Sequence, residues 1–234
     1  MTTIIKSLAN ENYSIFNVDS NKAPVDKCGI RMNKWIDMKC EELRKQHNYN
    51  SLLWGMKMGE HENGKCILSL DFDVCGKKNK EGVRVGCPET QAKLEEYFKG
   101  VGDKLDGMYE SSTEGNHNVL VDYSNCETIK DMVKQINSNK FCHHELEILL
   151  GGNQVIPPSA TTSKITGELG NQRKYKNNNL FYVLDESNPC FVYEFVRNLM
   201  ENKLKPINKM KIIKTKTELL TTEPMINMWI CCLT

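Results

Sequence analysis

The apolar and polar positions of the chain alternate between strand-like and helix-like spacing. The longest apolar run, residues 66–74, contains only one serine and two aspartates among its apolar side chains, which predicts a buried strand. Shorter apolar or alternating segments predict strands at residues 13–18, 51–55, 117–121, 146–150 and 154–156. Apolar side chains at helical spacing predict helices at residues 32–46, 89–98, 127–137 and 188–200.

The remaining segments are polar and rich in turn residues. Residues 59–64 and 76–88 predict loops, and residues 160–179 predict an open polar segment. Residues 203–234 begin with a Lys-rich stretch of little periodicity, which we interpret as a linker or tail leading to a further domain. Strands and helices alternate without a regular βαβ rhythm, so residues 1–202 are expected to form one domain of the α+β class.

Composition sets limits on the kind of protein this is. The chain has 234 residues, 39% of them hydrophobic and 26% charged, and a formal net charge of +1. Because the chain is nearly neutral, any binding of nucleic acid has to come from local basic patches. No apolar stretch approaches the roughly 18 residues of a membrane span, and the N-terminus does not resemble a secretory signal. The ten scattered cysteines then indicate reduced thiols, and we expect an intracellular protein that is not secreted.

Asp71 and Asp73 carry the clearest chemical signal. Residues two apart on a strand point to the same face. Two carboxylates about 4 Å apart, at an effective dielectric near 20, repel each other by roughly 4 kcal/mol, a cost that a divalent cation removes. Carboxylate oxygens suit Mg²⁺ or Mn²⁺, the ions of two-metal phosphoryl transfer. Such a pair alone also fits a strand that ends at the surface with both carboxylates solvated.

Three segments carry short motifs in a set order. Residues 50–73 run from Asn-Ser-Leu-Leu-Trp-Gly through a Gly-containing loop to the Asp-Phe-Asp strand end. Residues 115–117 read Gly-Asn-His before a strand, and residues 147–159 run from Glu through a Gly-Gly turn to Pro-Pro-Ser. With Lys22-Ala23-Pro24 and Trp35 upstream, these segments resemble the motifs of primase-polymerases of the archaeo-eukaryotic primase superfamily, which occur in plasmids, phages and large DNA viruses.

This resemblance implies a fold and an activity. The fold is an N-terminal αβ module plus an RRM-like antiparallel sheet with flanking helices, and the active site lies in the cleft between them. The activity is that of a DNA-replication primase or polymerase, a nucleotidyltransferase that uses nucleoside triphosphates, single-stranded DNA as template, and Mg²⁺ or Mn²⁺ in a two-metal site. Family members are often joined to a helicase, so a helicase domain or subunit is the implied partner.

The resemblance also implies residue roles. Asp71, Asp73 and Glu147 would bind the metals, and His117 would contact the phosphates of the incoming nucleotide. Gly115, Ser159, Arg173 and Lys174 are the further residues expected to contact the nucleotide. The chain departs from the pattern in having Glu147 where the third acid is often Asp, and Glu145, on the same strand face, leaves that assignment open by two positions. The insert between Cys75 and Cys87 is long for the family, and little after Tyr175 is recognisable.

Other polar residues support weaker readings. Cys75, Cys87 and Cys142-His143-His144 would make a zinc site only if the fold gathered them, and without a Cys-x-x-Cys pair in that region we expect no zinc. The basic residues Lys77, Lys78, Lys80 and Arg84 either steer a template strand or are solvated loop side chains.

Two other functions stay open. One is a nicking endonuclease of the rolling-circle type, with His143 and His144 on the metal and a tyrosine such as Tyr175 as nucleophile. Adjacent strand residues face opposite ways, which argues against that histidine pair. The other is a catalytically inactive RRM-like module that binds single strands. The chain has no Gly-x-x-x-x-Gly-Lys-Ser/Thr motif, so the sequence predicts no P-loop motor.

Overall fold

The computed structural model describes residues 3–76, 78–143 and 146–205 of the chain. Contacts divide the chain into two units, Met1–Leu204 and Lys205–Thr234, and the first holds all helices and strands of the described ranges. The predicted linker at 203–234 begins inside the last helix, which ends at Leu204, and from residue 206 onward it lies outside the described residues. Within the described ranges, no helix is both long and apolar enough to cross a membrane.

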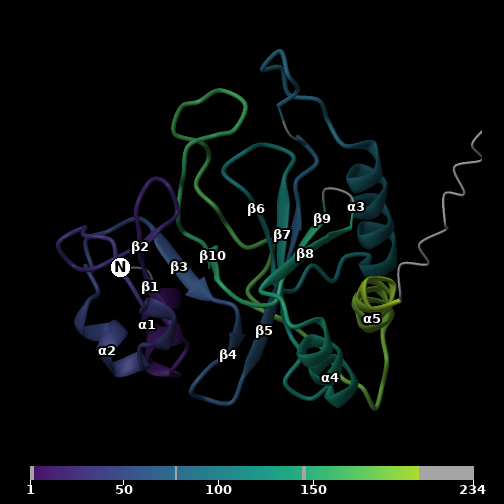
Figure 1. The fold of residues 1–234 in the computed structure, drawn as a ribbon, viewed down its shortest axis with the longest axis horizontal. Coiled ribbons are helices and arrows are strands. Elements are labelled where there is room, and N and C mark those ends of the chain that lie inside the picture. The colour runs from purple at the N-terminus through teal and green to yellow at the C-terminus, as the bar shows by residue number, and fades with distance from the viewer. Residues whose placement is uncertain (1–2, 77, 144–145, 206–234) are drawn as a thin grey trace, which may run out of the picture. The chain divides into compact units, whose positions relative to one another are not determined.

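The larger of two sheets is built around one buried central strand. In the described ranges its strands follow the path β11-β7-β5-β9-β8, with β4 paired to β5 and β6 paired to β7 (Figure 1). All pairs are antiparallel except β11 with β7. The bounds are β4 (Gly59–Glu60), β5 (Cys66–Phe72), β6 (Met108–Glu110), β7 (His117–Asp122), β8 (Lys140–His143), β9 (Leu146–Leu149) and β11 (Tyr182–Val183).

The smaller sheet comes mostly from the N-terminal part of the chain. Its strands follow the order β10-β3-β1-β2, and all of its pairs are antiparallel. The bounds are β1 (Ile15–Val18), β2 (Pro24–Val25), β3 (Trp54–Lys57) and β10 (Asn153–Val155). The helix α1 (Thr3–Asn10), the 3₁₀ turn η1 (Trp35–Asp37) and the helix α2 (Cys40–Lys45) belong to this part of the molecule.

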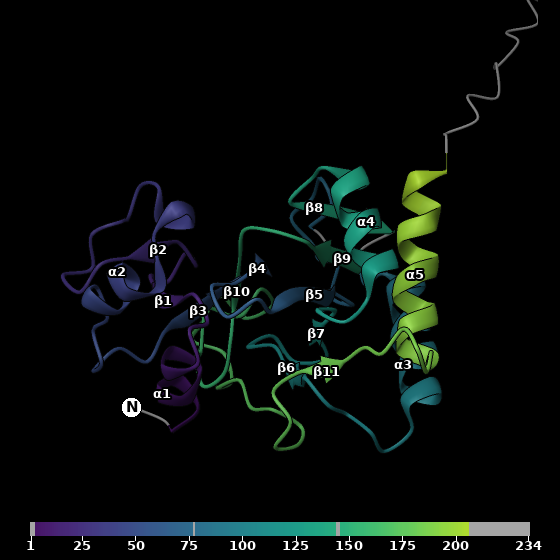
Figure 2. The same ribbon diagram turned by 90° about the horizontal axis from the view of Figure 1, so that it is seen from below.

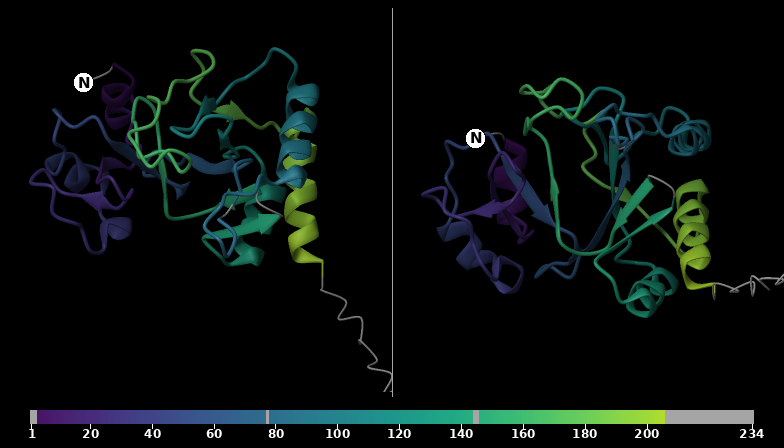
Figure 3. Two further views of the ribbon diagram at one scale, coloured as in Figure 1. Left: turned by 90° about the horizontal axis from the view of Figure 1, so that it is seen from above. Right: turned by 45° about the horizontal axis from the view of Figure 1, so that its top comes forward.

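Three helices cover the face of the larger sheet that is turned away from the smaller sheet. They are α3 (Pro88–Val101), α4 (Glu127–Ile136) and α5 (Phe191–Leu204), with α5 packed against both α3 and α4 (Figures 2 and 3). Strand β5 is buried on both of its faces, which explains its nearly continuous apolar sequence. Leu68 and Leu70 join the core under these helices, and Ile67 joins a second core with Trp54 and Leu8.

Two chain crossings join the sheets. Strand β3 continues through β4 into β5, and β9 continues through a short turn into β10. The segment from β3 to β5 therefore pairs twice with the segment from β9 to β10. In the smaller sheet β3 pairs with β10, and in the larger sheet β5 pairs with β9. This double pairing fixes the corner between the sheets.

The α+β class predicted from the sequence is confirmed, and most predicted strands and helices lie within a few residues of the observed ones. The helix predicted at 32–46 is wrong. Lys34 adopts a left-handed conformation with φ of 63°, and Met38 is extended with ψ of 138°, so only a 3₁₀ turn and the short α2 form there. The strand predicted at 51–55 begins only at Trp54. Helix α1 was not predicted, although Ile5, Leu8 and Ala9 are buried at helical spacing.

Candidate functional site

A row of polar side chains crosses the larger sheet at the corner between the two sheets. Asp71 of β5 lies opposite Glu147 of β9 on one side and opposite Asn118 of β7 on the other. Side chains that face each other across antiparallel strands have Cβ atoms about 5 Å apart and lie on the same face of the sheet. Asp73 follows two residues after Asp71, just beyond the end of β5. The register thus gathers the three predicted metal ligands, whereas Glu145 lies outside the described residues.

These carboxylates influence one another. Burial raises the pKa of Asp71, the negative charges of Asp73 and Glu147 add to the rise, and Lys164 is the main group that opposes it. An acid that is crowded in this way is stabilised in its charged form by a nearby cation. Three carboxylates on neighbouring strand positions form a donor set of hard oxygens, which fits Mg²⁺ or Mn²⁺.

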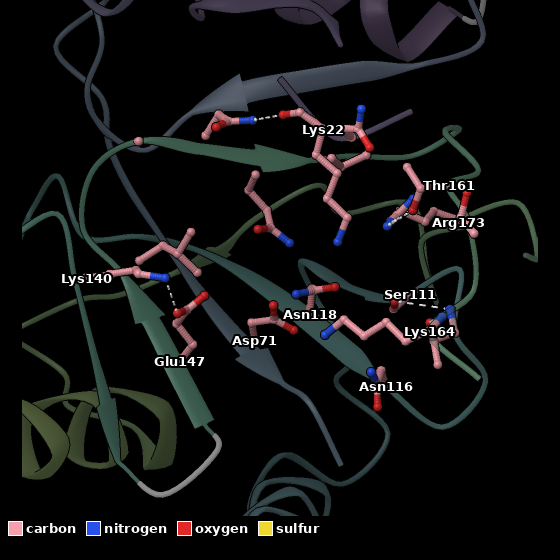
Figure 4. Close-up of a pocket in the computed structure, with 18 of the residues that line it drawn as sticks. Lys22, Asp71, Ser111, Asn116, Asn118, Lys140, Glu147, Thr161, Lys164 and Arg173 are labelled. Carbon is pink, nitrogen blue, oxygen red and sulfur yellow. Dashed lines mark hydrogen bonds and ion pairs between the residues drawn. The ribbon is translucent and has the colours of Figure 1, made fainter. Parts of the chain in front are cut away.

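Lysines already engage two of the three acids. Lys164 forms an ion pair with Asp73, and Lys140 Nζ lies 2.6 Å from Glu147 Oε1. Asn116 Nδ2 also donates to Asp73 Oδ1 at 2.6 Å. As these side chains are placed, no three His, Cys, Asp or Glu residues of the described ranges form a ready metal-binding group. Figure 4 shows Lys140 on Glu147, with Asp71 between them and Lys164.

A pocket of ≈ 390 Å³ lies above this row, and its walls are mainly cationic and amide side chains. The strands of the larger sheet form its floor, and residues 151–155 and the segment before β2 form the wall on the side of the smaller sheet. The charged residues that line it are Lys22, Asp71, Lys140, Glu147, Lys164 and Arg173. A pocket with acids at its floor and an excess of cations around them fits a ligand that carries several negative charges together with a metal.

Lys22, Asn116 and Asn118 were not among the predicted site residues. Figure 4 shows the Lys22 side chain pointing into the pocket from the smaller sheet. The Lys-x-Pro segment could have pointed to Lys22 as a site residue. Lys22 lies just before β2, which begins at Pro24, and it lines the pocket. Asn118 is 2% exposed and its Nδ2 has no hydrogen-bond partner in the structure, so it is a buried donor at the pocket floor.

Arg173 lines the pocket, as predicted, but much of its hydrogen-bonding capacity is used internally. Its Nη1 donates to Ser112 Oγ at 2.7 Å, and its Nη2 donates to Thr161 Oγ1 at 3.0 Å. Arg173 is 3% exposed, burial lowers its pKa, and its Nε has no partner. Nη1 also donates to the Ser159 carbonyl oxygen at 3.3 Å, so three of the five N–H groups hold the guanidinium in place, and the Nε–H and one Nη2–H have no partner among the described residues.

The Ser159 side chain is not positioned to contact a nucleotide, so this placement does not support the role predicted for it. Its side chain is fully buried, and its Oγ accepts from Trp54 N at 2.7 Å and donates to Trp54 O at 3.1 Å. Ser159 thus ties the segment after β10 to β3. Lys174 lies in a separate surface hollow beside Glu110 and Tyr175, so the fold does not bring it to the pocket either.

His117 lies on the other face of the sheet from Asp71. It pairs with Phe72 in the strand register, and its ring stands edge-on to Phe98 of α3 at a centroid distance of 5.5 Å. Its Nδ1 donates to the Gly115 carbonyl oxygen at 3.1 Å, and burial lowers its pKa. Gly115 has φ of +80° and forms the turn before β7, but neither residue lines the pocket. The predicted contacts of Gly115 and His117 with nucleotide phosphates are therefore not supported by this placement.

The residues considered for zinc are engaged elsewhere. Cys75 Sγ lies 3.4 Å from the Glu114 carbonyl oxygen, Cys87 accepts from Thr90 beside the start of α3, and Cys142 lies 3.9 Å from Glu147. His144 is outside the described residues. The expectation that zinc is absent stays a prediction.

A second hollow, of ≈ 460 Å³, adjoins the same acids. It shares Asp71, Glu147 and Lys164 with the pocket and adds Asp73, Lys78 and Arg84 from the loop after β5. Asp71 and Glu147 thus line both hollows, and each hollow has basic side chains in its wall. Comparison of the chain with models of protein families, with curated proteins and with solved structures found no match.

Proposed function

We propose that the chain is the catalytic core of a DNA-replication primase-polymerase. It transfers nucleotidyl groups from nucleoside triphosphates to a growing strand, directed by a single-stranded DNA template and dependent on Mg²⁺ or Mn²⁺. In this proposal the smaller sheet with its helices is the N-terminal αβ module, the larger sheet is the RRM-like sheet, and the site lies at the corner between them. The protein works inside a cell, together with a helicase domain or subunit.

One observation carries this proposal. Strand register, not loop proximity, aligns Glu147 with Asp71 and leaves Asp73 at the end of the same strand. The acids come from the first and third segments of the family resemblance, which are more than 70 positions apart in the sequence. Asp71 and Glu147 line a cation-walled pocket and meet Asp73 in the adjoining hollow, an arrangement that suits two-metal chemistry on a triphosphate.

In this proposal the acidic and the basic side chains of the site have different roles. Asp71, Asp73 and Glu147 hold the divalent cations, which when bound lower the pKa of the attacking hydroxyl and offset the charge that develops on the phosphate. Lys22 and Arg173, on the opposite wall, neutralise and orient the triphosphate. The 3′-oxygen of the primer or first nucleotide forms a bond to the α-phosphorus and loses its proton, and the bond to the pyrophosphate leaving group breaks.

The second hollow is the path of the nucleic acid strand in this proposal. Lys78 and Arg84 lie at its wall, on a loop whose Val83 and Val85 side chains are more than half exposed. Arg84 Nε donates to the Lys164 carbonyl oxygen at 2.7 Å, which joins this loop to the loop after β10. Aliphatic side chains next to basic ones suit a single strand, whose bases contact apolar groups while its phosphates contact the cations.

The test is nucleotide incorporation on single-stranded DNA, with and without a primer, in Mg²⁺ or Mn²⁺. Asp71→Asn, Asp73→Asn and Glu147→Gln keep the side-chain shapes while removing the charges, and each is expected to abolish the products. Asp131→Asn is the matched control, because Asp131 is an exposed acid on α4 that pairs with Lys134. Products that persist in Asp71→Asn would refute the proposal. The lanes without primer separate a primase from a polymerase.

The other two functions have less support. A rolling-circle nicking enzyme needs an accessible tyrosine, but the Tyr175 hydroxyl is buried without a partner, and burial raises its pKa well above the ordinary value. A covalent 5′-phosphotyrosine adduct would decide for that enzyme. Binding of single strands by an inactive module does not require three adjacent carboxylates. Such a module would bind DNA equally well after Asp71→Asn and without divalent metal.

A further inference from the structure

The backbone of Lys164 is fixed on both sides, whereas the end of its side chain is held by an ion pair with Asp73. Its N–H donates to Thr113 Oγ1 at 3.0 Å, and its carbonyl oxygen accepts from Arg84 Nε at 2.7 Å. These bonds tie residue 164 to the turn before β7 and to the loop after β5. The side chain is 35% exposed and ends in an ammonium group on a flexible four-carbon stem. A short swing of this stem suffices to carry the charge from Asp73 into the pocket, which Lys164 also lines.

The ion pair places a protein cation on a predicted metal ligand. Lys164 Nζ is bonded to Asp73 Oδ2, while Asn116 Nδ2 occupies the other oxygen, Oδ1. A metal that binds Asp73 through Oδ2 has to displace the ammonium. The displaced ammonium then loses Asp73 as its partner, and an anion that enters the pocket would supply a new one.

The net charge of the site stays close to that of the empty site only when metal and triphosphate arrive together. The pocket and the adjoining Asp73 hold four cationic side chains, Lys22, Lys140, Lys164 and Arg173, against three acids. Two divalent cations alone would leave a large positive excess, and a triphosphate alone would leave a negative one. Together they nearly cancel, because two divalent cations carry as much positive charge as a fully ionised triphosphate carries negative charge.

We infer, on the basis of the function proposed above, that Lys164 is an exchangeable counter-cation. It neutralises Asp73 in the metal-free protein, is displaced when a divalent cation binds Asp73, and then binds a phosphate of the nucleotide. Lys164 thereby couples metal binding to nucleotide binding, so that each is taken up more tightly in the presence of the other. Arg84 is a positioning residue for this exchange, because it holds the backbone from which Lys164 swings.

The exchange is tested by binding, without any measurement of activity. The variant Lys164→Met keeps the length of the side chain and removes its charge. Free Mn²⁺ is followed by electron paramagnetic resonance, and binding of a non-hydrolysable nucleoside triphosphate is followed by calorimetry at saturating Mn²⁺. Lys176→Met is the matched control, because Lys176 is 33% exposed and pairs with Glu110 outside the pocket. Lys164→Arg keeps the charge.

The affinities for Mn²⁺ and for the triphosphate are expected to change in opposite directions. Lys164→Met binds Mn²⁺ alone about tenfold more tightly, because its competitor has gone, and binds the triphosphate about tenfold more weakly. An ion pair that remains partly exposed, with Lys164 at 35% and Asp73 at 17%, is a modest competitor, so changes much above about tenfold are not expected. Lys164→Arg stays close to wild type, and Lys176→Met changes neither affinity.

Mn²⁺ affinity that is unchanged or weaker in Lys164→Met overturns the inference. Asp71→Asn, measured in parallel, separates this failure from failure of the proposed function. If Asp71→Asn loses Mn²⁺ binding while Lys164→Met has no effect, the metal site stands and the exchange is refuted. If Asp71→Asn binds Mn²⁺ as wild type does, the proposed metal site fails, and the exchange fails with it.

Discussion

Replacing Asp71 by Asn is expected to stabilise the metal-free protein while removing its function. Asp71 is the central acid of the row, with Glu147 opposite it and Asp73 two residues along the strand. A carboxylate about 5 Å away, at an effective dielectric near 20, repels it by roughly 3 kcal/mol. Lys164 and Lys140 neutralise much of the charge of these neighbours. The repulsion that remains, and that Asp71→Asn relieves, is then about 1–2 kcal/mol.

The measurement is a thermal melt with and without divalent metal. For a domain of this size about 1–2 kcal/mol corresponds to a rise in Tm of roughly 4 °C in EDTA. With metal at tenfold its Kd the wild type gains about 1.4 kcal/mol, and Asp71→Asn gains nothing, so the difference shrinks or reverses. Asp131→Asn, an exposed surface change, should stay within about 0.5 kcal/mol of wild type under both conditions. A lower Tm for Asp71→Asn in EDTA would show that the acids do not repel one another as described.

Three further results are expected. Ser159→Ala should lower the free energy of unfolding by about 1–3 kcal/mol, because the buried Trp54 backbone groups lose their partner, and calorimetry should find triphosphate affinity unchanged. Burial lowers the pKa of His61 to about 4, so its stabilising effect is complete above the ordinary value of 6.5 and is lost as the pH falls toward 4; in urea melts across this range His61→Asn should show a shallower loss than wild type. Val85→Ser should weaken binding of single-stranded DNA several-fold, as measured by fluorescence anisotropy, because its apolar surface beside the second hollow is removed. The equally exposed Val183→Ser on β11 should have no effect, and equal losses in the two variants would contradict the proposed strand path.

The spacing of apolar residues predicted a strand or helix correctly where burial alone decides the local structure. The run at 66–74 reads as a buried strand, because apolar residues fill both of its faces, and β5 is buried on both faces. The segment at 32–46 has apolar residues at near-helical spacing as well. Backbone angles at Lys34 and Met38 interrupt the helix there, and periodicity alone contains no information about them.

The residues of the site were predictable from the sequence only where they belong to one of the short motifs. The Asp71-x-Asp73 spacing fixes a shared face, and the family resemblance drew attention to Glu147. Which residues oppose Asp71 depends on long-range strand register, so neither the alignment of Glu147 nor the place of Asn118 could be worked out from spacing. The same register turns His117 to the far face.

The central place of β5 also affects how the protein is made. This strand is synthesised well before its neighbours β7 and β9, which pair with its two edges. Until β9 emerges from the ribosome, an apolar strand with an open edge is exposed to other nascent chains, a known route to aggregation. A product that terminates before Leu146, the first residue of β9, would therefore lack the third acid and leave β5 unprotected, so truncated copies should be insoluble as well as inactive.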